Sequence, residues 1–142
     1  MKITVHGPPG AGNRLVGRIL DAAPHDWDVT VMHLPGKWFD ADFYVFTSRD
    51  LDGLMASILK EGMVHTEHEA MKMISAAHRQ VREHFERELR PEDFTFARLN
   101  DLATDGPGPL INKLAEKLNV MPWVFTEEIY DPNEKYGLTP PF

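Results

Sequence analysis

The chain alternates short apolar runs with longer segments in which apolar residues recur at helical spacing. The apolar runs at 1–6, 27–32, 42–47 and 94–97 predict four strands. Helices are predicted over 13–23, 51–61, 66–89 and 110–118, and the longest of these places Met71, Ile74 and Val81 on one stripe. Strands separated by helices predict a three-layer α/β/α fold with a mainly parallel sheet of about four strands.

The organisation along the chain predicts one domain and a tail. At 142 residues, 42% of them hydrophobic, the chain can bury a sizeable core. We expect residues 1–120 to form the domain and residues 121–142 to form an irregular C-terminal tail, packed on the domain or extending from it. The tail contains Trp123, Phe125 and Phe142, which would cover an apolar face of the domain or form a subunit contact. The sequence does not decide between these two, so an oligomer formed through the tail is one of the alternatives.

Composition narrows the function classes. The chain has no cysteine, which excludes disulfides and thiolate metal sites and is compatible with a reducing compartment. Its formal net charge of −7 argues against broad nucleic-acid binding, which needs a basic face. No apolar run approaches membrane-spanning length, and the N-terminus lacks the apolar core of a signal peptide. We therefore expect a cytoplasmic protein that binds neither a membrane nor nucleic acid.

The loop between the first predicted strand and the first predicted helix is typical of a phosphate-binding loop. Residues 7–12 read GPPGAG. Glycines let the backbone approach an anion, and N–H groups at the start of the next helix point toward it. The spacing matches the G-x-x-x-x-G part of a P-loop, but Asn13 and Arg14 stand where lysine and Ser/Thr would follow. Ordinary ATP chemistry is therefore disfavoured.

Further polar side chains fall at or after the carboxyl ends of predicted strands, where ligands bind in parallel sheets. His33 can titrate near neutrality and take a proton from a hydroxyl, or it can be a partly buried histidine that donates to a backbone carbonyl. Arg49 and Ser57, eight residues apart, suit a phosphate monoester. The alternative is that Arg49 pairs with Asp50 or Asp52, and that Ser57 is small where its helix packs on the sheet.

In their order along the chain, these motifs resemble the PAPS-dependent sulfotransferases. The matching segments are GPPGAG at 7–12, HLP at 33–35, Arg49-Asp50 with Ser57, and LNDL at 99–102 followed by Asp105 and Pro107. The resemblance spans roughly residues 1–120 and implies a P-loop NTPase-like fold. It also implies 3′-phosphoadenosine 5′-phosphosulfate (PAPS) or its product PAP as cofactor, and a hydroxyl acceptor.

The same resemblance implies roles for individual residues. His33 would be the catalytic base, and Arg49 with Ser57 would bind the 3′-phosphate of the nucleotide. The loop would hold the 5′-phosphate through Pro9, Gly10, Ala11, Gly12, Asn13 and Arg14. The acceptor is unspecified, because the segments that would shape its pocket are short.

The chain departs from the family pattern at its charged positions. Gly10 stands where the family usually carries lysine or arginine, and the C-terminal R-K-G segment is missing from the sequence. The loop cation stabilises charge during transfer. A non-catalytic nucleotide- or anion-binding module is therefore the second hypothesis. The third is a nucleotide kinase-like protein, since residues 7–12 are identical to the loop opening of adenylate kinases, although these need lysine at position 13.

We predict no metal site. His65 and His68 have the i,i+3 spacing of helical ligands, but no matching third and fourth ligands accompany them in the sequence. Their segment is expected to form the exposed first turn of the long helix, where acidic residues suit the helix dipole.

Overall fold

The computed structural model describes residues 1–86 and 89–129, and there it confirms the α/β class. Its strands are β1 (Lys2–Gly7), β2 (Asp28–His33), β3 (Phe43–Ser48) and β4 (Phe94–Arg98). Its helices are α1 (Asn13–Asp21), α2 (Leu51–Lys60), α3 (Glu67–Glu86), α4 (Leu99–Asp105) and α5 (Gly108–Leu118), with a short 3-10 turn, η1 (Pro91–Asp93), before β4.

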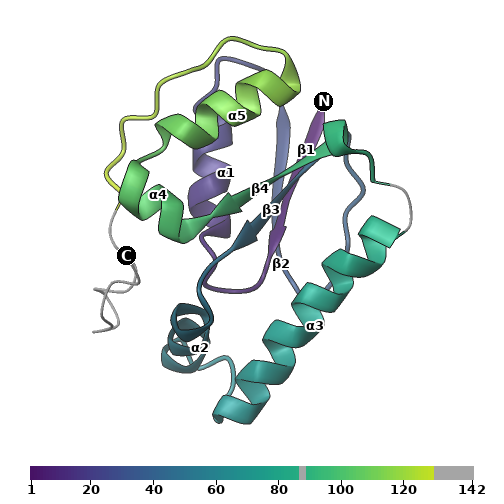
Figure 1. Cartoon of the computed structure of the whole chain (residues 1–142), viewed down its shortest axis with the longest axis vertical. Coiled ribbons are helices and arrows are strands. Elements are labelled where there is room, and N and C mark those ends of the chain that lie inside the picture. The colour runs from purple at the N-terminus through teal and green to yellow at the C-terminus, as the bar shows by residue number, and fades with distance from the viewer. Residues whose placement is uncertain (87–88, 130–142) are drawn as a thin grey trace.

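The four strands form one parallel sheet in the order β2-β1-β3-β4. Val5 of β1 lies opposite Val31 of β2 on one side and Val45 of β3 on the other. The chain therefore runs outward from β1 to β2 and then crosses back to β3. The connections diverge at the carboxyl ends of β1 and β3, which is where doubly wound sheets bind ligands. The arrowheads in Figure 1 point toward this end, where α2 lies.

Helices α1, α4 and α5 cover one face of the sheet (Figure 1). The apolar core on this side joins strand residues such as Ile3, Val5 and Val45 to residues of these three helices. The segment 121–129 has no regular structure, as expected for the tail, and Trp123 packs into this core while its Nε1 donates to the carbonyl of Ile19 at 2.8 Å. The remainder of the tail, including Phe142, lies outside the described residues.

A layer of aromatic rings, contributed by the sheet, by α3 and by Trp38, lies between the opposite face of the sheet and α3. It consists of His6, Trp38, Tyr44, Phe46, His84, Phe85, Phe94 and Phe96. His6 is fully buried, with its ring centroid 4.3 Å from that of Trp38, and Trp38 stacks on His84 at 3.4 Å. Burial lowers the pKa of His6 to about 4, and the nearby His84 adds to this effect. Helices on both faces complete the predicted three layers.

Several boundaries differ from the sequence prediction. Helix α4 was not predicted, because its seven residues give too few turns for a periodic pattern to show. Helix α5 begins at Gly108, two residues earlier than expected, because proline in the first turn has no N–H to lose. Helix α1 ends at Asp21 rather than at residue 23. Helix α3 is described as far as Glu86, residues 87–88 lie outside the described part, and residue 89, where the prediction placed the end of the helix, is not helical.

In the described residues, no helix combines the length and the apolar character that crossing a membrane requires.

Candidate functional site

The glycine loop has a backbone shape that only glycine adopts readily. Gly10 and Gly12 both have φ of +84°, and Gly12 is the N-cap of α1. No side chain caps this helix, and the N–H groups of its first residues have no partner within the helix. Ala11 is buried in a second apolar cluster with Leu54 of α2 and Ile74 of α3. The cluster anchors the loop, while the first turn of α1 presents amides at the end of the sheet.

Asn13 ties the loop to two strand ends. Its Nδ2 donates to the carbonyls of Gly7 at 3.0 Å and Pro8 at 3.3 Å, and lies 2.8 Å from Nδ1 of His33. Its Oδ1 accepts a hydrogen bond from the hydroxyl of Thr47. The side chain is almost completely buried. At the position where a P-loop would carry lysine, this chain has a buried amide whose contacts join the loop to β2 and β3.

The structure brings Arg49 and Ser57 together at Gly10, but it buries both of them. The Arg49 side chain is 1% exposed, and its Nη1 donates to the carbonyl of Gly10 at 3.1 Å. Ser57 packs so closely on Gly10 that a Cβ there would collide with it. The position where the resemblance expects a loop cation therefore has no room for a side chain.

This geometry matches the alternative interpretation of Arg49 and Ser57, in which the arginine pairs with a neighbouring aspartate and the serine is small because its helix packs closely. Nε of Arg49 lies 3.7 Å from Oδ1 of Asp50, and Ser57 is small where α2 packs, here against the loop. The guanidinium is buried against the backbone of the loop at Gly10 and does not line the open groove. The role of Arg49 and Ser57 as ligands of a 3′-phosphate stays a prediction.

Asp50 and Asn100 form a polar clasp beneath this site. Asp50 caps α2 by accepting from the N–H of Gly53 at 2.8 Å, and Asn100 Nδ2 donates to Asp50 Oδ1 at 2.8 Å. Burial alone would raise the pKa of Asp50, but these hydrogen bonds and the Arg49 charge outweigh it and lower the pKa. The clasp fixes the start of α2, and through it Ser57. Sequence reasoning missed the role of Asn100 because its partner is fifty positions away.

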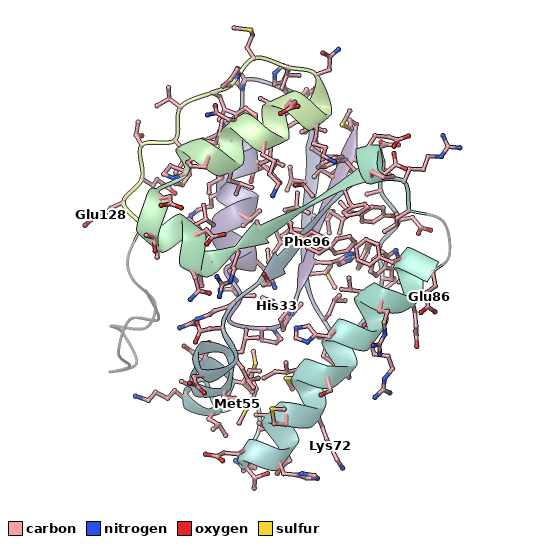
Figure 2. The ribbon with its side chains drawn as sticks, viewed as in Figure 1. His33, Met55, Lys72, Glu86, Phe96 and Glu128 are labelled. Carbon is pink, nitrogen blue, oxygen red and sulfur yellow. The ribbon has the colours of Figure 1, made fainter. Side chains whose placement is uncertain are left out.

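A groove of about 540 Å³ lies above the loop. Seven of the nine predicted site residues line it: Pro9, Gly10, Gly12, Asn13, Arg14, His33 and Ser57. Ala11 and Arg49 lie beneath the surface. This volume is within the range of small-molecule sites. The predicted residues therefore converge on one concave surface, and His33 is seen between the end of the sheet and α2 in Figure 2.

The groove also contains four residues that the sequence analysis did not single out: Leu15, Arg18, Glu61 and Met63. Arg18 follows Arg14 at i,i+4 spacing on α1, a signal that could have found it. Its Nε is bonded to Oε2 of Glu127 at 3.0 Å. Glu61 and Met63 follow α2 and reach the groove only because α2 packs against the loop, so no sequence pattern points to them.

The electrostatics of the groove centre on His33 and Arg14. Burial lowers the pKa of His33, and the positive charge of Arg14 lowers it further. His33 is half-buried and Arg14 is exposed. Both effects favour the neutral form of the ring beside the positively charged Arg14. Within the described ranges, no group of three or more His, Asp or Glu side chains is placed to hold a metal ion.

Comparison with models of protein families, with curated proteins and with solved structures produced no match.

Proposed function

We propose that the protein is a nucleotide-binding module with a P-loop-like loop, and that its ligand is PAP or PAPS. The carrying observation is that the groove joins the glycine loop, the uncapped first turn of α1, Arg14 and His33. Backbone N–H groups and a guanidinium are suitable donors for a phosphate. The phosphate would lie over the first turn of α1, with the adenosine along the groove.

Binding without transfer is the version that the geometry supports best. Gly10 leaves no space for the cation that would stabilise charge on the phosphosulfate bridge, and Asn13 is bonded within the fold. Electrostatic stabilisation of the transition state is commonly the largest catalytic contribution. The buried amide at position 13 also argues against the kinase hypothesis, which requires a lysine that neutralises phosphates.

Sulfate transfer to an acceptor hydroxyl is the second candidate, and one observation favours it. His33 borders the same groove as the phosphate loop, so a histidine lies beside the proposed nucleotide. In this version His33 acts as general base. An assay of sulfate transfer from PAPS to hydroxyl acceptors decides between the two. Activity in wild type that is lost in His33→Ala would show that the protein is a sulfotransferase and not only a binding module.

A thermal-shift comparison of PAP, PAPS, ATP with magnesium, and inorganic phosphate tests the proposal. A ligand of the folded state adds about 2.7 kcal/mol at one hundred times its dissociation constant, or roughly 8 °C in a domain of this size. We expect PAP and PAPS to stabilise the protein most. Arg14→Gln should weaken this effect, whereas Arg79→Gln on the exposed side of α3 should leave it unchanged. Melting temperatures that no nucleotide raises would refute the proposal.

A further inference from the structure

The contact between Asn13 and His33 determines where the imidazole carries its proton. Nδ2 of Asn13 lies 2.8 Å from Nδ1 of His33, which is a hydrogen-bond distance. A neutral imidazole has one donor nitrogen and one acceptor nitrogen. Which one faces Asn13 therefore decides what the ring offers to the groove.

The orientation of the Asn13 amide is fixed by partners that have a single role. The carbonyls of Gly7 and Pro8 can only accept, so the nitrogen of the amide must face them. On the other side, the Thr47 hydroxyl donates to Oδ1. A flipped amide would set its oxygen against two carbonyl oxygens. The amide nitrogen has two hydrogens for three neighbours, so one hydrogen is shared, and the contact to Pro8 at 3.3 Å is the longest of the three. An amide nitrogen does not accept hydrogen bonds, so Nδ1 of His33, 2.8 Å away, must be the acceptor.

We infer that Asn13 is a positioning residue that holds His33 in the Nε2–H tautomer, so that the ring presents a hydrogen-bond donor to the groove. Nε2 has no hydrogen-bond partner among the residues that the structure describes. The asparagine at the position of the P-loop lysine thus has a role of its own. It converts a histidine that could titrate into a neutral donor.

This inference rests on the proposed function where it concerns the ligand. A donor at Nε2 selects a hydrogen-bond acceptor, such as an unprotonated phosphoryl or sulfuryl oxygen. Together with the amides of α1 and the Arg14 guanidinium, it makes this end of the groove a site built from donors. In the same tautomer, His33 has no free lone pair on Nε2 with which to take a proton from a hydroxyl.

The first test is the tautomer of His33 in the ligand-free protein. Long-range ¹H–¹⁵N NMR on histidine-labelled protein distinguishes the two tautomers, and His33→Gln assigns the signal among the seven histidines. We expect an unprotonated Nδ1 and a protonated Nε2 at neutral pH. Asn13→Ala should lose this preference and give a mixture. A wild-type ring that is mainly in the Nδ1–H form overturns the inference, and this result does not depend on whether Asn13→Ala folds.

The second test measures the donor by calorimetric titration with PAP. Glutamine at position 33 keeps an N–H donor, whereas leucine of similar size keeps none. We expect His33→Gln to bind PAP within a few-fold of wild type and His33→Leu to bind roughly tenfold more weakly or worse. PAP that binds His33→Leu as tightly as wild type overturns the donor role.

The two tests separate this inference from the proposed function. An Nε2–H ring in a protein that binds no PAP would refute the nucleotide proposal and the ligand part of the inference, while it would uphold the tautomer. An Nδ1–H ring in a protein that binds PAP would uphold the nucleotide proposal and refute both the tautomer and the donor role of His33.

Discussion

Wild type should lose stability on mild acidification, and replacing His6 with phenylalanine should abolish much of that loss. His6 is 0% exposed, and its ring lies beside those of Trp38 and of Tyr44 in β3. Its pKa in the folded protein is about 4, against an ordinary value of 6.5. Between these values the unfolded chain binds the proton that the folded protein excludes. Stability therefore falls as pH drops below the ordinary value, and the loss is complete near the folded pKa.

The magnitude follows from the size of this shift. Each unit of pKa difference corresponds to about 1.4 kcal/mol, so the full shift corresponds to about 3 kcal/mol at low pH. By pH 5 the linkage relation gives a loss of about 2 kcal/mol from this one ring. Phenylalanine has no such group and keeps an aromatic ring against Trp38.

The assay is urea unfolding of wild type and His6→Phe at pH 7.5 and pH 5. The wild type should lose about 2 kcal/mol more than the variant between these two pH values. His65→Gln serves as the control, because His65 is exposed, and it should behave like wild type. Equal losses in wild type and His6→Phe would show that His6 is not held neutral by burial. If the variant does not fold, an NMR titration of His6 in wild type gives the same answer, and a pKa near 6.5 would refute the reasoning.

Three further substitutions test the site and the core by chemical denaturation. Gly10→Ala should lower the free energy of unfolding by about 2 kcal/mol or more, because Gly10 has a positive φ and the added methyl group would collide with Ser57. The control Gly62→Ala has a similar φ but open space around it, and it should cost about 1 kcal/mol. Equal costs for the two variants would contradict the packing argument. Asp50→Ala should cost about 1–2 kcal/mol through loss of the α2 cap. Since the folded pKa of Asp50 is lowered, this cost should shrink as acidification passes through that pKa, and a pH-independent cost would contradict the assignment. Trp123→Ala should cost about 3–5 kcal/mol, and a loss below 1 kcal/mol would show that the tail does not belong to the core.

Much of the fold could be predicted from the sequence, because the signals are local. The apolar run at 42–47 gives β3 its burial on both faces. The apolar spacing through Ile74 marks α3, although Met71 of the predicted stripe is exposed in the structure. The glycine loop was recognisable because Gly10 and Gly12 stand at the positions where the backbone needs a positive φ. Helix α4 was missed because it makes barely two turns.

The site could be predicted only as a set of residues at one end of the sheet. Spacing brought Arg49 and Ser57 to the loop, but it could not show that α2 would press them against Gly10 and bury the guanidinium. The bonds from Asn13 to His33 and Thr47 join the loop to β2 and β3, so they depend on a strand order that no local pattern specifies. Local sequence therefore located the groove, and long-range packing decided what each side chain does there.

The central claim is that the groove above the glycine loop binds a phosphorylated adenosine nucleotide. A titration with PAP followed in ¹H–¹⁵N correlation spectra tests it most directly, because it reports affinity and location together. We predict saturable shifts in the amides of Gly12, Asn13 and Arg14 and in the ring of His33, and weaker binding in Arg14→Gln. Spectra that do not change, or shifts that fall only around the separate pocket lined by Arg98 and Lys113, would contradict the account.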